Sequence, residues 1–209
     1  MFNLKQLGVA VPLALLALGS AQANVANGSL WIVPEASSQN ATLANVPATA
    51  ADVTFSVNTP FNFTSNLGYT ISDFLASSSS FNIAEHTAGT LSSFMDTGGH
   101  GTLIYFTGMV SVTNGQQFTV THDDGLTLII GGTNLNANPG PTAPSVNTYT
   151  YNGPSGNQTF QLVYGECCGA PAVLQVDLPL AAVPEPETYA LMFAGLGAVG
   201  VGVARRRRA

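Results

Sequence analysis

Short runs of alternating or purely apolar residues recur along the chain, and Gly, Pro and Asn separate them. This pattern is typical of strands in an all-β sandwich or barrel. Because Lys, Glu and Arg are almost absent from the same region, long helices are disfavoured, and we predict an antiparallel β-sandwich of one domain. Ile71–Ser80 fits a short helix or a turn, and Asn134–Ser145, with three prolines, is expected to be a surface loop. The predicted strands are Gly28–Val33, Val53–Val57, Phe81–Ile83, Gly101–Val112, Gln117–Thr121, Leu126–Ile130, Asn147–Tyr151, Gln158–Tyr164 and Ala172–Leu178.

Two of these strands alternate clearly enough to assign their faces. Phe118 and Val120 point to one side of their strand, away from the polar residues between and around them. Phe160, Leu162 and Tyr164 likewise share one face of a later strand. Such half-apolar strands fit antiparallel sheets with one face toward the core and one toward solvent.

The first 23 residues have the three parts of a secretory signal peptide. Lys5 supplies the positive charge, residues 7–18 form a short apolar run, and Ala21-Gln22-Ala23 is a small-x-small cleavage site. The alternative is an uncleaved anchor, but the run is shorter than the roughly 20 apolar residues of a membrane-spanning helix. We therefore predict a mature chain that begins near Asn24.

The C-terminal segment combines a short motif, an apolar stretch and a cluster of arginines. After the motif, residues 189–204 form an apolar stretch, and Arg205–Arg208 precede the last residue, Ala209. Four arginines resist translocation, so the tail end is expected to stay cytoplasmic with the body outside. An ordinary single-span anchor is one interpretation. The motif itself reads Val183-Pro184-Glu185-Pro186-Glu187.

The order of these three parts resembles the PEP-CTERM sorting signal. The resemblance covers residues 183–208 and implies processing by an exosortase at the inner membrane of a Gram-negative bacterium that makes extracellular polysaccharide. It divides the chain into a signal peptide (1–23), a β-sandwich domain (24–179) and a linker with the sorting signal (180–209). The expected destination is the cell surface or the extracellular matrix.

Charge separates the body from the two ends. All five basic residues are Lys5 and the four terminal arginines, so residues 24–182 contain no Lys or Arg. Of eleven acidic residues, two lie in the tail motif and nine remain in the body, which gives it a charge near −9 with neutral histidines. Such a surface repels nucleic acid and favours cations and neutral partners. Nucleic-acid binding is therefore excluded, and nucleotide chemistry is disfavoured.

Asp123, Asp124 and Gly125 join two of the predicted strands. Asp-Gly is a preferred hairpin turn, and a turn alone would explain these residues. The other interpretation starts from repulsion between adjacent carboxylates, which no basic side chain of the body can relieve. Water, backbone N–H groups or a cation must then do so, and Ca²⁺ accepts 6–8 oxygen ligands at about 2.3–2.6 Å. His122 is expected to hydrogen-bond to the pair.

The segment Thr121-His122-Asp123-Asp124-Gly125-Leu126 resembles the protective-antigen-like β-sandwich domain of bacterial toxins and yeast flocculins. Lectin members bind Ca²⁺ through this Asp pair, joined by a cis peptide bond, and through a side chain from a later loop. In Leu162-Val163-Tyr164-Gly165-Glu166, the glutamate takes the place of the flocculin asparagine. The resemblance, which covers about residues 101–178, implies calcium ligands Asp123, Asp124 and Glu166. The sugar-contacting loops of flocculins are not shared.

Cys167 and Cys168 are the only cysteines of the chain. Zinc is disfavoured because two adjacent thiolates provide too few ligands. A vicinal disulfide, an intermolecular bridge and two free thiols remain, and the oxidising compartment favours a disulfide. A vicinal disulfide would stiffen residues 165–171 beside Glu166.

Three functions follow from these features. The first is a non-catalytic surface or matrix protein, associated with biofilm or exopolysaccharide, that binds calcium and through it a glycan. The second is a purely structural matrix protein in which Asp123-Asp124-Gly125 is only a turn. The third is a secreted enzyme acting on a polysaccharide, which lacks an evident nucleophile and base.

Overall fold

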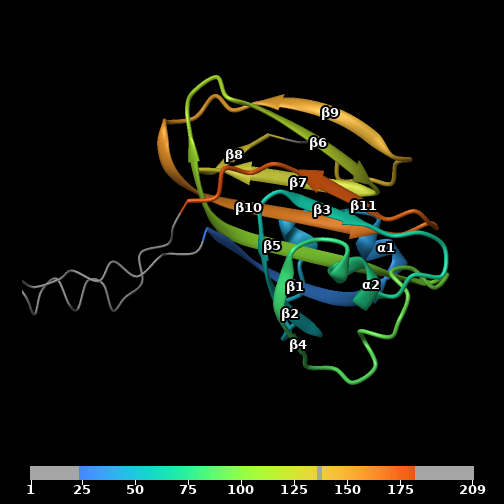
Figure 1. Cartoon of the computed structure of the whole chain (residues 1–209). Coiled ribbons are helices and arrows are strands. Elements are labelled where there is room, and N and C mark those ends of the chain that lie inside the picture. Colours follow the sequence, from blue (N-terminus) through green and yellow to red (C-terminus); the bar gives the residue numbers. More distant parts are fainter. Residues whose placement is uncertain (1–23, 136–137, 182–209) are drawn as a thin grey trace, which may run out of the picture.

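A computed structural model describes residues 24–135 and 138–181. Within these residues the strands form two antiparallel sheets (Figure 1), as predicted. The larger sheet has the order β4-β2-β1-β5-β10-β7-β8 and the smaller one the order β3-β11-β6-β9. The strands are β1 Val25–Pro34, β2 Val53–Asn58, β3 Phe61–Thr64, β4 Ser80–Glu85, β5 His100–Val112, β6 Gln117–Asp123, β7 Gly125–Ile130, β8 Thr133–Asn134, β9 Ser145–Thr150, β10 Gly156–Glu166 and β11 Val173–Val176.

The helices are short and lie in the connections. They are α1 Glu35–Ser38, a 3-10 helix at Leu43–Asn45, and α2 Ile71–Ala76. Helix α2 begins with a capping box, in which the Thr70 side chain accepts the Asp73 N–H and the Asp73 carboxylate accepts the Thr70 N–H. This arrangement satisfies backbone donors that a helix start leaves free. The segment predicted as a helix or a turn is thus a helix over its first six residues.

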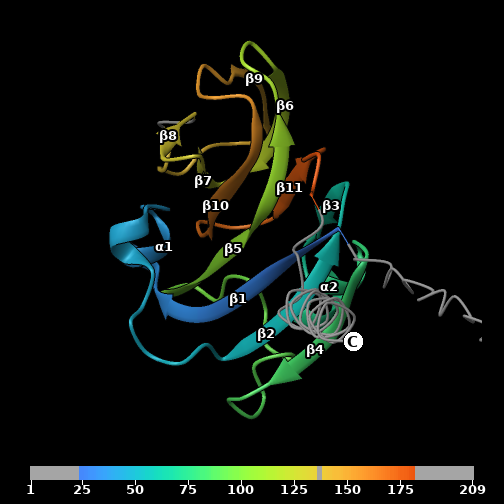
Figure 2. The ribbon, with the colours of Figure 1, turned by 90° about the vertical axis from the view of Figure 1, so that its left-hand side faces the viewer.

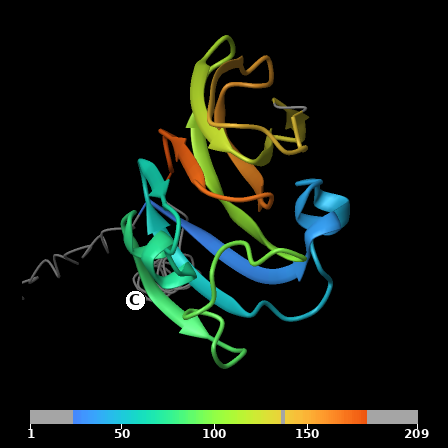
Figure 3. The same cartoon turned by 90° about the vertical axis from the view of Figure 1, so that its right-hand side faces the viewer.

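Apolar side chains of both sheets meet in one core. In β2 the buried side chains are Val53, Phe55 and Val57, with half-buried polar residues between them, as the period of a strand requires. The core contains a cluster of aromatic rings from several elements, in which Phe63 stacks on Phe74 of α2 at 5.1 Å between ring centroids. Figure 1 shows β3 and β11 in front of β5 and β10, and the turned views of Figures 2 and 3 show them as a separate layer.

The outer face of the larger sheet is not simply solvated. Val163 of β10, expected to face outward, is fully buried in a second apolar cluster with Trp31 and Leu103. The segment that follows β1, including α1, covers this face, and Figure 3 shows α1 and α2 on opposite sides of β1 and β5. The prediction of one solvated face is therefore wrong here. Both faces of β10 are covered here, because alternate side chains of the strand pack into two different apolar clusters.

Two short strands have no counterpart in the predicted set. They are β3, which pairs with β11, and β8, which pairs with β7. The predicted signal peptide and sorting tail lie outside the described residues, so the proposed domain boundaries stay predictions. In the described part of the chain, no helix has the length and apolar character needed to cross a membrane.

Candidate metal and ligand site

The Asp pair lies where the chain passes from one sheet to the other. Strand β6 ends at Asp123 in the smaller sheet, and β7 begins at Gly125 in the larger one. A hairpin turn would pair these strands with each other, but β6 pairs with β9 and β11 while β7 pairs with β8 and β10. The interpretation of Asp-Gly as a hairpin turn is therefore wrong. The peptide bond between Asp123 and Asp124 is cis, as the resemblance implies.

Asp124 is held by two backbone N–H groups from different loops. Cys167 N–H donates to Asp124 Oδ2 at 2.9 Å, and Thr142 N–H donates to Asp124 Oδ1 at 3.1 Å. Burial raises the pKa of Asp124, while these two hydrogen bonds act in the opposite direction. The carboxyl group is thus oriented before any ligand arrives.

Asp123 is the weaker acid of the pair. Burial, the negative charge of Asp124 and a hydrogen bond between the two carboxyl groups together raise its pKa to about 7, with burial the largest cause. The same shared hydrogen bond lowers the pKa of Asp124, so the proton between them belongs to Asp123. Near neutral pH the two groups together carry less than their full charge of −2.

His122 supports the main chain of the pair. It is fully buried, and its Nδ1 lies 2.5 Å from the Asp124 carbonyl oxygen. Its Nε2 lies 3.4 Å from Asn147 Nδ2. An N–H at Nδ1 donates to the carbonyl, and an unprotonated Nε2 can accept from the amide, so one tautomer satisfies both contacts. The predicted hydrogen bond to the pair thus goes to its backbone.

Gly125 lies where the chain packs closely against residues 138–140. A Cβ atom at this position would lie 2.0 Å from the Pro139 carbonyl oxygen, so only glycine allows the two chains to pack here. Leu126 N–H donates to the Asn138 carbonyl at 2.9 Å and pairs the same segments. This packing places Thr142 over Asp124.

The two aspartates open into a cavity, called here the Asp-pair cavity, with a volume of about 420 Å³. One wall is the proline-rich segment 141–144 and the other is the loop 167–171. Cys167 and Cys168 are joined in a vicinal disulfide in this loop. Both aspartates are buried in their surroundings, with exposed fractions of 6% and 5%. The cavity is therefore their route to solvent.

Glu166, the third residue of the predicted ligand set, takes a different position. Its carboxyl group is 1% exposed, and the Tyr164 hydroxyl hydrogen-bonds to both Glu166 Oε2, at 2.6 Å, and the Asp123 main-chain carbonyl. A phenol has one proton, so both contacts are satisfied together only when Glu166 is protonated. Burial raises the pKa of Glu166 to about 10, which agrees with a neutral carboxyl group at pH 7.

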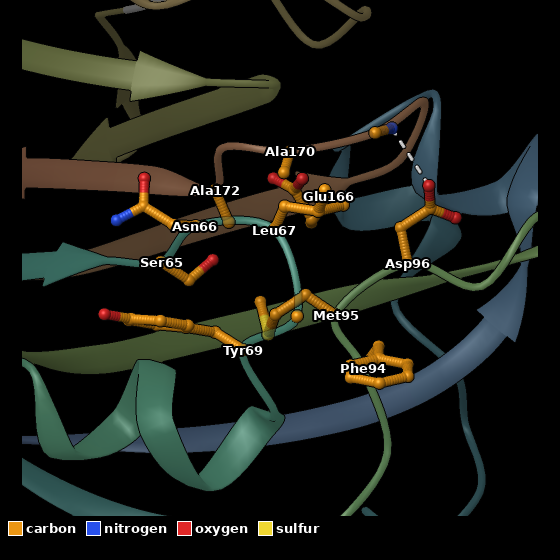
Figure 4. A pocket seen from close by; sticks show the side chains of 12 residues that line it. Ser65, Asn66, Leu67, Tyr69, Phe94, Met95, Asp96, Glu166, Ala170 and Ala172 are labelled. Atoms are coloured by element: carbon orange, nitrogen blue, oxygen red, sulfur yellow. Dashed lines mark hydrogen bonds between the residues drawn. The ribbon is translucent and has the colours of Figure 1, made fainter.

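Glu166 lines a second cavity of about 280 Å³, called here the Glu166 cavity (Figure 4). Asp96 lies at the same cavity, where its Oδ2 accepts the Gly169 N–H at 2.9 Å. Its negative charge also raises the pKa of both Asp124 and Glu166. Asp96 was not among the sequence candidates, since it lies in a loop before β5 with no recognisable motif around it.

The fit of a metal ion follows from the chemistry of these donors. Within the described residues, one group of three side chains has candidate ligand atoms that all lie within 4.8 Å of one another, and it consists of Asp124, Cys167 and Cys168. The two sulfur atoms form a disulfide and offer no thiolate, which leaves carboxylate and main-chain oxygens. Hard oxygen donors suit Ca²⁺. Asp123 and Asp124 would hold the ion from the cavity side, whereas Glu166 reaches the pair only through Tyr164.

No basic side chain compensates these acids, because the described residues contain no Lys or Arg. The loop 167–171, called here the disulfide loop, is therefore surrounded by carboxyl groups that no cationic side chain neutralises. They belong to Asp96, Asp123, Asp124 and Glu166. The sequence of the predicted sorting tail matches a known family. Residues 182–208 match the family described as the PEP-CTERM protein-sorting motif.

The chain carries a PEP-CTERM sorting motif. The motif contains the predicted Val183, Pro184, Glu185 and Pro186, and it marks an exported protein that an exosortase sorts at the membrane toward the surface of a Gram-negative cell. No curated protein matches the chain in sequence.

Two solved structures resemble the body of the chain. One is a PA14 sugar-binding domain from an RTX adhesin, with 20% identity and a TM-score of 0.52, covering 75% of this chain and 89% of that one. The other is the PA14 domain of the antifreeze protein MpAFP, with 21% identity and a TM-score of 0.50, covering 84% and 88%. At this identity the likeness shows the fold alone, and that fold is a β-sandwich, as predicted.

Proposed function

We propose that this protein is a non-catalytic, calcium-dependent glycan-binding protein of the cell surface or extracellular matrix, associated with exopolysaccharide in a biofilm. The observation that carries the proposal is the pair of aspartates that open together into the Asp-pair cavity with no cationic side chain to neutralise them. A PA14 domain of the same fold is described as sugar-binding, which supports the same class of ligand.

The proposal places calcium on Asp123 and Asp124. A bound calcium ion would offer open coordination positions to sugar hydroxyl groups at the mouth of the cavity. The chain itself supplies the orientation, through the N–H groups of Cys167 and Thr142 and through His122 below the pair. The role of Glu166 as a third ligand stays a prediction, and Glu166→Gln tests it.

The purely structural alternative predicts no effect of calcium on the protein. We expect calcium at about 100 times its Kd to stabilise the protein by about 2.7 kcal/mol. At roughly 2–4 °C per kcal/mol for a domain of this size, the melting temperature rises by about 5–11 °C. Differential scanning calorimetry of the purified protein, with calcium and with chelator, measures this shift.

Asp124→Asn assigns the effect to the site. The amide keeps an acceptor for only one of the two loop N–H groups and removes the charge, so we expect most of the calcium shift to disappear. Asp177→Asn, an exposed acid away from both cavities, is the matched control and should retain the full shift. Identical melting curves with calcium and with chelator in the unsubstituted protein would contradict the calcium proposal, and a glycan array with added calcium then tests the sugar.

A further inference from the structure

The Glu166 cavity is separated from the Asp-pair cavity by the disulfide loop. Gly169 and Ala170 line both cavities, while the rest of the Glu166 cavity is lined by residues 65–69, residues 94–96, Glu166 and Ala172. Figure 4 shows Glu166 and Ala170 on one side of the cavity and Tyr69, Met95 and Phe94 on the other. A volume of about 280 Å³ is close to the lower end of small-ligand pockets, roughly 300 Å³.

The walls of this cavity are tied together by the main chain. Thr70 and Phe94 form an antiparallel bridge, and Ile71 N–H donates to the Ser93 carbonyl at 2.8 Å. On the other side, Ser65 N–H donates to the Ala172 carbonyl at 2.8 Å. The cavity is therefore formed before a ligand binds, so binding has little ordering cost.

Two carboxyl groups provide the polar part of the cavity. Glu166 is almost wholly buried and lines it, and its single side-chain hydrogen bond within the described residues joins Oε2 to the Tyr164 hydroxyl. Its second oxygen is thus a free acceptor. Asp96 supplies a negative charge, with one oxygen fixed by Gly169 N–H. A donor with positive charge would satisfy both groups at once.

Exposed apolar side chains surround the same cavity. Leu67, Phe94 and Tyr69 are 90%, 49% and 44% exposed, and all three line it. They account for half of the six large apolar side chains that are exposed in the described residues. Aromatic rings beside carboxylates favour a ligand with an apolar face and a cationic group. With no Lys or Arg in the described residues, an acidic ligand would be repelled.

We propose that the Glu166 cavity binds an amine-bearing sugar, such as a glucosamine unit of a polysaccharide, with its ammonium group at Asp96 and Glu166 and its ring against Phe94 and Tyr69. The inference rests on the proposed function in taking a glycan as the ligand. It differs from the calcium proposal in requiring no metal ion, because the ammonium group of the ligand supplies the positive charge beside the carboxyl groups.

Isothermal titration calorimetry of the full-length protein in detergent tests this with three probes. They are a glucosamine tetramer, its fully N-acetylated counterpart and a tetralysine peptide, each titrated with calcium and with chelator. We expect the glucosamine tetramer to bind under both conditions. N-acetylation removes the charge and should weaken binding by about tenfold or more, since a hydrogen bond to a charged group is lost.

Two substitutions locate the binding. Asp96→Asn keeps an acceptor for Gly169 N–H but removes the charge, and we expect about tenfold weaker binding of the glucosamine tetramer. Phe94→Ala should weaken it by about threefold or more. The matched controls are Asp177→Asn for charge and Val146→Ala for an exposed apolar side chain, and both should bind as the unsubstituted protein does.

Three results would overturn the inference. They are the absence of glucosamine binding, binding that survives both cavity substitutions, and tetralysine binding as tight as that of the sugar. The last result would show that the cavity takes an amine without a sugar. If calcium-dependent binding of other glycans persists while glucosamine binding is absent, only this inference fails. If glucosamine binds and calcium has no effect on the protein, the calcium proposal fails instead.

Discussion

At the scale of single residues, three carboxyl groups on two adjacent cavities differ in protonation. Asp124 accepts two backbone N–H groups that favour its charged form, whereas Asp123 shares its proton with Asp124. Glu166 is buried against Tyr164 and is neutral at pH 7. These differences arise from the N–H groups and the burial around each carboxyl, since the side chains are chemically almost identical.

The raised pKa values predict the pH dependence of stability. A carboxyl group with a raised folded-state pKa stabilises the fold below its unfolded pKa, and this contribution is lost as the pH rises through the folded value. For Asp123 the window runs from 3.8 to about 7, and for Glu166 from 4.5 to about 10. In chelator, the melting temperature should therefore fall as the pH rises through both windows.

Two variants separate these windows. Asp123→Asn should flatten the curve only below about pH 7, whereas Glu166→Gln should flatten it from pH 4.5 to about pH 10, because each removes one titrating group. Calcium should reduce the fall in the lower window by binding the ionised pair. A melting temperature in chelator that rises between pH 4 and pH 7 would contradict this assignment.

At the scale of elements, short loops and helices position the site against the sheets. Phe74 of α2 stacks on Tyr164 at 6.0 Å, so this helix supports the residue that links Asp123 and Glu166. The disulfide loop contributes Cys167 N–H to Asp124 from the other side. The sheets provide the rigid frame, and these connections carry the functional groups.

The helix cap gives a prediction at this scale. Thr70→Ala removes the capping side chain of α2 and should lower the free energy of unfolding by about 1 kcal/mol. Thr70→Ser keeps the hydroxyl group and should cost much less. Chemical denaturation curves measure both variants, and equal losses for Ala and Ser would argue against the capping role.

The disulfide loop gives a second prediction. Replacing Cys167 and Cys168 together with serine should weaken calcium binding by about tenfold, because a looser loop no longer holds the N–H group on Asp124. Titration calorimetry with calcium measures the change. Reduction of the unsubstituted protein should have the same effect, and unchanged affinity in both experiments would show that the loop does not orient Asp124.

At the scale of the whole molecule, charge and the sorting motif act together. The motif marks the chain for export, and the body it delivers has nine acidic residues and no basic ones. Outside the cell such a body meets divalent cations and neutral or cationic polymers, which its charge favours. Its two cavities lie on either side of one loop, so under the two proposals one polysaccharide chain would have two adjacent positions for contact.

The sorting motif predicts a processing defect. Replacing Pro184 and Glu185 with alanine should leave the chain uncleaved by the exosortase, so that it accumulates with its tail in the inner-membrane fraction. Immunoblots of fractionated cells and the mass of the purified chain measure this. Thr188→Ala, beside the motif, should be processed normally. Normal processing of the double variant would show that the exosortase does not recognise Pro184 and Glu185.

Some features follow from the sequence because they depend on local order. Apolar alternation located nine of the strands, and the sorting motif is a linear signal that needs no fold to be recognised. The Asp pair was also visible as two adjacent acids without a basic partner. By contrast, β3 and β8 are too short for a periodic pattern and are defined by the strands that they pair with.

The tertiary structure decided how those parts meet. Asp123-Asp124-Gly125 connects two sheets instead of closing a hairpin, because the strands on either side pair with distant partners. Asp96 joins the site from a loop some 70 residues before Gly169 in sequence, and Glu166 faces a separate cavity since Tyr164 holds its carboxyl group there. The sequence by itself determined export, the β class and the acidic pair. Long-range pairing and burial decided which carboxyl groups share a cavity and which of them carry charge.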